Sequence, residues 1–220
     1  MKITMISKLL LTTIFFFLNQ GVLKSQNKKL AHIDYYHPID TLLVKTNLSP
    51  FQRLPMIGLK FWQMKSYNDP GLNCQFYPSC SNFCAISIYK EGSIIGISKG
   101  LDRFIRCNNS AQKKYKVYEY GTFNYGGNRL IDEYIEGSIK SNKSFYIGLG
   151  LTVVPGLGRA YYGQIEDAKN SFLYTVGFGL LSLIMKENSK DTISMGFAIT
   201  SLFFWSTDFL ALYKMDSIEK

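Results

Sequence analysis

A segment that combines cysteines with a proline constrains the fold of this chain more than any other feature. Residues 74–80 read Cys-Gln-Phe-Tyr-Pro-Ser-Cys. Pro78 has a fixed φ angle and keeps the preceding residue out of the α region, so the run before it is predicted to be extended or turning. A helix is predicted to begin near Cys80, because the hydroxyl group of Ser79 or Ser81 can accept a hydrogen bond from its first turn.

Two helices are predicted to follow this segment. The first covers residues 81–91 and ends at Gly92, a residue typical of a helix C-terminus. The second is capped by Ser93 and reaches Arg106. One of its faces is apolar (Ile94, Ile97, Leu101, Ile105) and another is basic (Lys99, Arg103, Arg106). Such a basic stripe is most often solvated, and contact with lipid phosphates or acidic protein segments is its functional alternative.

The cysteine segment, together with the later run Arg-Phe-Ile-Arg-Cys, resembles the signature of the membrane protein insertion efficiency factor (YidD) family. That signature is C-x-F-x-P-[ST]-C-S, then a helix, then R-x-x-R-C. The matching residues are Cys74, Phe76, Pro78, Ser79, Cys80, Ser81, Arg103, Arg106 and Cys107. The resemblance covers residues 59–107 and implies a non-enzymatic protein that assists the insertion of integral membrane proteins. It also implies the bacterial inner membrane as location, with phospholipid, the membrane insertase and nascent membrane proteins as partners.

An amphipathic helix is predicted over residues 53–65, because apolar side chains recur there at spacings of three and four (Leu54, Ile57, Phe61, Met64). The resemblance places a membrane-binding helix close to this position. The candidate membrane-binding residues are Lys60, Phe61, Trp62, Lys65 and Lys99. The spacing is equally compatible with an apolar stripe that packs on the rest of the domain.

The overall composition favours a lipid partner. The net charge of +9 suits an anionic partner. Aromatic residues make up 15% of the chain and charged residues only 19%, below the average of about 25%. This combination favours a phospholipid surface over nucleic acid, so no nucleic-acid partner is predicted.

The N-terminal residues have the plan of a targeting segment. Lys2 and Lys8 precede an apolar run at residues 9–18, and small residues follow at Gly21 and Ser25. Residues 1–25 are therefore predicted to be a signal peptide, with an uncleaved anchor as the alternative. Residues 26–52 are predicted to be irregular.

The C-terminal third is predicted to be a transmembrane helical hairpin. A polar linker over residues 108–143 leads to it, and residues 144–220 hold two charge-free apolar stretches at 170–185 and 193–207. The run before them resembles the opening of TM2-type small bacterial membrane domains, and its membrane turn would consist of Pro155, Gly156, Gly158, Tyr161 and Gly163. Arg159 and Asp208 are ionisable residues near the segment ends, where interfacial placement is expected.

The chain is thus predicted to be all-α: an insertion-factor-like module over residues 53–107, then the linker and the hairpin. No catalytic residue, cofactor or metal site is predicted, because no catalytic constellation is visible. Zinc held by Cys74, Cys80, Cys84 and Cys107 is a minor alternative. The export signal supports a rival function, an exported, disulfide-bonded, membrane-tethered interaction module of the cell envelope.

Overall fold

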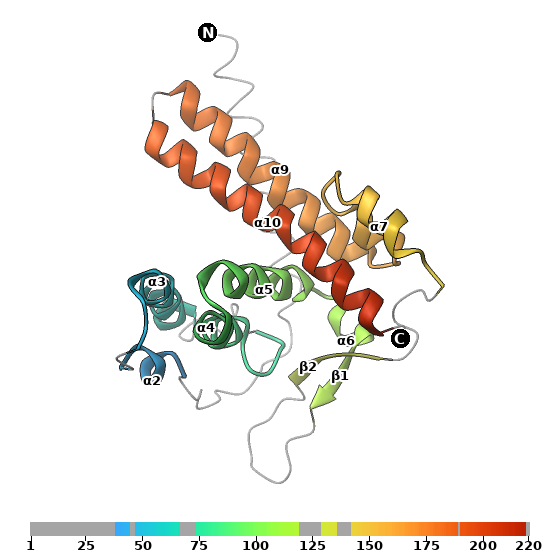
Figure 1. Cartoon of the computed structure of the whole chain (residues 1–220), viewed down its shortest axis with the longest axis horizontal. Coiled ribbons are helices and arrows are strands. Elements are labelled where there is room, and N and C mark those ends of the chain that lie inside the picture. The colour runs from blue at the N-terminus through green and yellow to red at the C-terminus, as the bar shows by residue number, and fades with distance from the viewer. Residues whose placement is uncertain are drawn as a thin grey trace. The chain divides into compact units, whose positions relative to one another are not determined.

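The computed structural model describes residues 38–44, 47–66, 74–118, 129–135, 142–188 and 190–218 (Figure 1). They fall into two compact units, one ending before Lys140 and one beginning there. The signal peptide predicted for residues 1–25 lies outside the described residues.

The N-terminal unit consists of short helices around a small apolar core. Its first four helices are α2 (Pro38–Val44), α3 (Pro50–Ser66), α4 (Cys80–Glu91) and α5 (Ser93–Arg106). The core contains Ile39, Met56, Ala85 and Ile88, each exposed by 1% or less. Helix α2 lies within the segment that was predicted to be irregular. Ser49 and Gln52 exchange hydrogen bonds at the start of α3, in the manner of a capping box.

The ends of α4 confirm the sequence prediction. The hydroxyl of Ser79 accepts a hydrogen bond from the backbone N–H of Asn82, which fixes the N-terminus of the helix. At the other end Gly92 has φ +86°, and its N–H donates to the carbonyl of Ile88. Ser93 does not cap α5, because its hydroxyl donates to the carbonyl of Phe51 on α3 instead.

Helices α4 and α5 cross at very short range. A Cβ atom added at Gly96 would lie 2.5 Å from the Cα of Ile88 and 2.7 Å from the carbonyl carbon of Ser87. One at Gly100 would collide with the side chain of Cys84. The two glycines, four residues apart on one face of α5, therefore allow the helix backbones to touch.

The unit also contains a two-stranded antiparallel sheet, so the prediction of an all-α fold was wrong in this part. After the short helix α6 (Ala111–Lys114), strand β1 (Tyr115–Tyr118) pairs with β2 (Arg129–Tyr134). Both strands lie in the segment predicted as a linker. Leu130 bonds to the cysteine segment, since its N–H donates to the carbonyl of Gln75 and its carbonyl accepts from Tyr77. The predicted linker is therefore hydrogen-bonded to the cysteine segment, which its polar composition did not indicate.

The C-terminal unit contains α7 (Phe145–Leu151), α8 (Leu157–Tyr161), α9 (Ile165–Glu187) and α10 (Asp191–Ile218). Helices α9 and α10 are long, lie side by side and run antiparallel (Figure 1). Hydroxyl groups link them, because Ser182 and Ser194 donate to each other's carbonyls and Ser201 donates to the carbonyl of Thr175.

Among the described helices, α10 alone is long and apolar enough to cross a membrane, judged by length and composition. Helix α9 is paired with it but does not meet that test. Glu166, Asp167 and Lys169 occupy the first turns of α9 and shorten its apolar part. The predicted helical pair is thus present, with one candidate membrane span in it, at residues 191–216.

Candidate functional site

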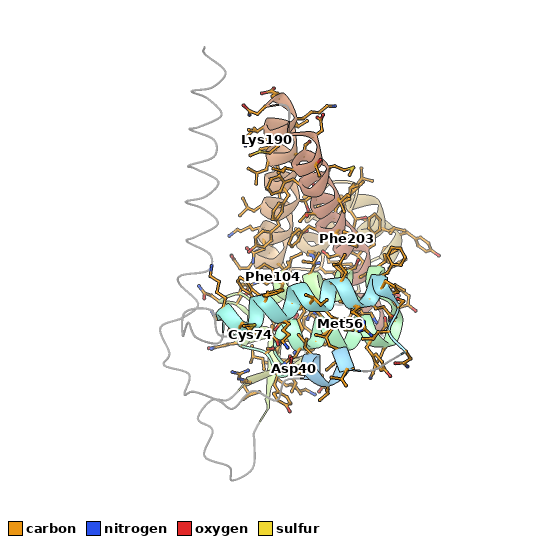
Figure 2. The ribbon with its side chains drawn as sticks, turned by 90° about the vertical axis from the view of Figure 1, so that its left-hand side faces the viewer. Asp40, Met56, Cys74, Phe104, Lys190 and Phe203 are labelled. Carbon is orange, nitrogen blue, oxygen red and sulfur yellow. The ribbon has the colours of Figure 1, made fainter. Side chains whose placement is uncertain are left out.

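Three cysteines meet where the ends of α4 and α5 come together. Cys74 lies in the loop before α4, Cys80 is the first residue of α4, and Cys107 directly follows α5. The Sγ atom of Cys74 is 3.1 Å from that of Cys80 and 3.8 Å from that of Cys107. The three sulfur atoms all lie within 4.8 Å of one another. Figure 2 marks Cys74 among the side chains of this unit.

The three thiols differ in acidity. Hydrogen bonding with the thiols of Cys107 and Cys80 holds the pKa of Cys74 well below its ordinary value. The pKa of Cys80 is raised by its hydrogen bonds with Cys107 and Cys74, and that of Cys107 is raised by its hydrogen bond with Cys74. Cys74 is therefore the group on which a first negative charge is best stabilised.

Cys84 does not join this group, so the alternative of a four-cysteine zinc site is wrong. Its side chain packs against Gly100 where α4 and α5 cross, and its thiol points to the carbonyl of Gly96. Burial raises the pKa of Cys84 to about 12. This cysteine acts as a small core residue.

Arg103 is fully buried, although it was predicted to belong to a basic stripe. Its guanidinium lies over the rings of Phe76 and Phe83, with centroid distances of 4.9 and 4.5 Å. It donates a hydrogen bond of 3.0 Å to the carbonyl of Tyr77. A planar cation suits a site between two aromatic faces, and this arrangement fixes the loop between Cys74 and Cys80.

Arg106 is also buried and is neutralised within the unit. It forms ion pairs with Asp102, one turn earlier, and with Asp132 of β2, and it donates to the hydroxyl of Tyr115. Two of the three members of the predicted basic stripe, Arg103 and Arg106, therefore point inward, and Lys99 remains at the surface. A spacing of three and four places residues on one face but does not tell which face is covered.

The apolar stripe of α3 faces outward. The predicted residues Leu54, Phe61 and Met64 are 74%, 68% and 60% exposed, and Ile57 is 39% exposed. Phe51 and Trp62 extend this exposed surface. The alternative in which the stripe packs on the rest of the domain is therefore wrong. We call these six residues the outer face of α3.

The inner face of α3 is comparatively polar. Met56, marked in Figure 2, enters the core, but Gln63 is also buried there. The amide nitrogen of Gln63 donates to Asn82 at 2.6 Å and to Ser81 at 2.9 Å. Gln52 likewise donates to the carbonyl of Ile88. A helix that buries amides and exposes six large apolar side chains has the reverse of the usual pattern for a water-facing helix.

The candidate lysines lie at the surface of the same unit. Lys60 pairs with Asp40 of α2 at 2.7 Å, and Lys99 pairs with Glu91 at 2.7 Å. Lys65 is exposed on the same side of α3 as its outer face. These contacts leave the cationic heads accessible.

A second polar cluster lies in the C-terminal unit. Arg159 and Asp208 form a fully buried ion pair of 2.6 Å, rather than standing at an exposed segment end. Asp208 also accepts from the N–H of Gly156 and from Ser171, while Arg159 donates to Thr207. Gly156 has φ +83° and touches Ala168, so the predicted turn at residues 155–163 is folded around this pair.

Sequence reasoning missed Asp102, Asp132 and Tyr115 as partners of Arg106. Asp102 stands four residues before Arg106, and this spacing is a signal that could have been read. Asp132 and Tyr115 could not be found in this way, because their proximity depends on a sheet that was not predicted.

The structure thus defines a small helical module, closed by a three-cysteine cluster and bearing an outward apolar helix. The sequence pattern of the YidD family, described as "Putative membrane protein insertion efficiency factor", matches residues 51–119. A protein of that name from Lactobacillus gasseri is 36% identical over 73 residues, which is 32% of this chain and 75% of the relative. One from Aquifex aeolicus is 36% identical over 53 residues, covering 24% of this chain and 78% of the relative. The chain belongs to the membrane protein insertion efficiency factor family.

No solved structure matches this chain. The family match lies within the N-terminal unit, while α2, β2 and residues 142–218 lie outside it. The relatives bear the name of insertion factors and not of enzymes.

Proposed function

We propose that this protein assists the insertion of integral membrane proteins into the bacterial inner membrane without catalysing a reaction. The observation that carries this proposal is the outer face of α3, which exposes six large apolar side chains in a chain whose relatives are named for this process. An exposed apolar surface of this kind marks a lipid or protein contact.

In this proposal α3 lies in the membrane interface, with its long axis along the surface. Phe61 and Trp62 enter the boundary between head groups and acyl chains, where aromatic rings are favoured. Lys60, Lys65 and Lys99 face anionic head groups. Helix α10 spans the bilayer with α9 packed against it, so the module is held close to the insertase and to nascent membrane proteins.

The fluorescence of Trp62 tests the membrane contact directly. The chain has two tryptophans, Trp62 and Trp205, so a Trp205→Phe variant leaves one reporter on α3. In vesicles with brominated acyl chains, we expect the emission of Trp62 to be strongly quenched and shifted to shorter wavelength. Unquenched emission, like that of the protein in water, would show that α3 does not enter the lipid.

An insertion assay tests the functional part of the proposal. We expect a Leu54→Ser/Phe61→Ser variant to show slower appearance of newly made membrane proteins in the bilayer when it replaces the wild-type protein in cells. Val117→Ser is the matched control, because Val117 is an exposed apolar residue of β1, 45% exposed, outside α3. Equal insertion rates in cells with wild-type protein and in cells without any would refute the role.

One observation favours the second candidate function, an exported and disulfide-bonded module of the cell envelope. The sulfur atoms of Cys74 and Cys80 are 3.1 Å apart, so a small movement would bring them to bonding distance. An impermeant thiol reagent applied to intact spheroplasts separates the two. Labelling only after permeabilisation supports the insertion role, whereas labelling of intact spheroplasts after reduction supports the envelope module.

A further inference from the structure

We propose that Cys74, Cys80 and Cys107 form a binding site for one thiophilic metal ion, with Zn²⁺ as the reference ion. This inference goes beyond the insertion role and does not depend on it. It also revises the sequence analysis, which predicted no metal site and whose zinc alternative included Cys84.

The spacing of the sulfur atoms fits a shared ion. In a tetrahedral zinc site with Zn–S bonds of about 2.3 Å, two ligand sulfurs stand about 3.8 Å apart. The Sγ atoms of Cys74 and Cys107 already have that separation, 3.8 Å. The sulfur atoms of Cys74 and Cys80, at 3.1 Å, need to separate by a fraction of an ångström.

The chemistry of the donors selects the class of ion. Three thiolates favour soft or borderline ions such as Zn²⁺ and disfavour Mg²⁺ and Ca²⁺, which take oxygen ligands. Among the described residues, no fourth His, Cys, Asp or Glu joins the group. In this proposal a water molecule takes the fourth position.

The surroundings of the cluster suit a charged metal site. The backbone N–H of Cys80 points to the Sγ of Cys74 at 3.3 Å, the kind of outer contact that orients a thiolate ligand. Three thiolates with Zn²⁺ leave one net negative charge. The buried guanidinium of Arg103 supplies a compensating positive charge, because it is bound to the carbonyl of Tyr77 in the loop between Cys74 and Cys80.

A metal ion at this position would join the N-terminus of α4 to the C-terminus of α5. Cys80 begins α4 and Cys107 follows α5, so the ion ties together the two open ends of the helical pair. Cys74 adds the loop that carries Phe76 and Tyr77. The ion would act as a staple for a module whose own apolar core is small.

Cobalt titration of the full chain tests the proposal. The reduced protein in detergent is titrated with Co²⁺, and a thiolate-to-cobalt charge-transfer band in the near ultraviolet is expected to saturate at one ion per chain. Zn²⁺ is expected to displace the cobalt and remove the band. Absence of the band in reduced, folded protein would overturn the proposal.

Single substitutions identify the ligands. Cys74→Ser, Cys80→Ser and Cys107→Ser are each expected to weaken Co²⁺ binding by at least about tenfold. Cys84→Ser is the matched control and is expected to bind as the wild type does. If Cys84→Ser loses the band as the others do, or if Cys107→Ser keeps it, the assignment is wrong.

The midpoint of thermal unfolding gives a second readout that does not require the variants to be stable. Zn²⁺ is expected to raise the midpoint of the wild type and of Cys84→Ser, and a chelator to lower it again. An unchanged midpoint at saturating Zn²⁺ would contradict the staple. The insertion assay is a separate measurement, so the metal site and the insertion role can each be refuted independently of the other.

Discussion

Arg103 and Arg159 are both fully buried cations, and they are held by different kinds of partner. Arg103 lies between two aromatic rings and donates to a backbone carbonyl. Arg159 is paired with the carboxylate of Asp208. Loss of a partner has different consequences at the two sites, because the carboxylate neutralises a charge that the rings only solvate.

Asp208→Asn is expected to destabilise the C-terminal unit by about 3–5 kcal/mol, since it leaves the buried charge of Arg159 uncompensated. The double variant Arg159→Met/Asp208→Leu removes both charges and is expected to recover most of this loss. Asp191→Asn, at the exposed start of α10, is the control and should cost no more than about 1 kcal/mol. Detergent-based unfolding titrations measure the differences. A double variant less stable than Asp208→Asn would contradict this account.

Cys84 is expected to resist alkylation in the folded protein. Burial raises its pKa to about 12, so at pH 8 only about one part in ten thousand is the reactive thiolate. We expect iodoacetamide at pH 8 to spare Cys84 until denaturant is added, as measured by mass spectrometry of the peptides. As pH rises towards 12, the thiolate fraction and the labelling rate should rise together. Equal labelling before and after unfolding would show that the thiol is accessible.

At the scale of secondary structure, the helices that carry local signals could be predicted from the sequence. Ser79 and Gly92 mark the two ends of α4, and both act as expected. The sheet could not be predicted, because β1 and β2 are short and they contact Phe76, which lies 39 residues before Tyr115 and 54 before Leu130. The burial of Arg103 and Arg106 could not be predicted for the same reason, since it requires partners outside α5.

The close crossing of α4 and α5 can be tested by adding a methyl group at one of the glycines between them. Gly96→Ala is expected to destabilise the N-terminal unit by about 1–3 kcal/mol, because the new methyl group meets backbone atoms that cannot move aside. Gly58→Ala on α3 is the control, because nothing lies within 4 Å of its added Cβ. It is expected to stabilise the protein by about 0.5–1 kcal/mol through helix propensity. Chemical unfolding of both variants compares them, and equal effects would argue against the close contact.

At the scale of the whole molecule, the family match covers residues 51–119, which form part of one of the two units. The motif contains Cys74, Cys80 and Cys107 and leaves out Cys84, but the meeting of their sulfur atoms depends on how α4 and α5 pair. The C-terminal unit lies outside the family match. Its polar cluster joins residues about fifty positions apart, so no local pattern could reveal it.

Helix α10 is expected to anchor the whole protein. Ile199 and Leu202 are exposed in the middle of α10, at 47% and 59%. Replacing both by Lys would add about 2.5–3.5 kcal/mol per residue to the cost of crossing a bilayer. We expect the wild type to remain in membranes after alkaline carbonate extraction and the double variant to be released. Tyr213→Lys, near the end of the helix, is the control, and release of both variants alike would contradict the assignment.

The reversed polarity of α3 has a consequence for the order of events during synthesis. Helix α3 leaves the ribosome before α4, which supplies the hydrogen-bond partners of its inner face. Its outer face needs none of them. A nearby bilayer can therefore order α3 first, and the later helices then fold onto a template that is already in place.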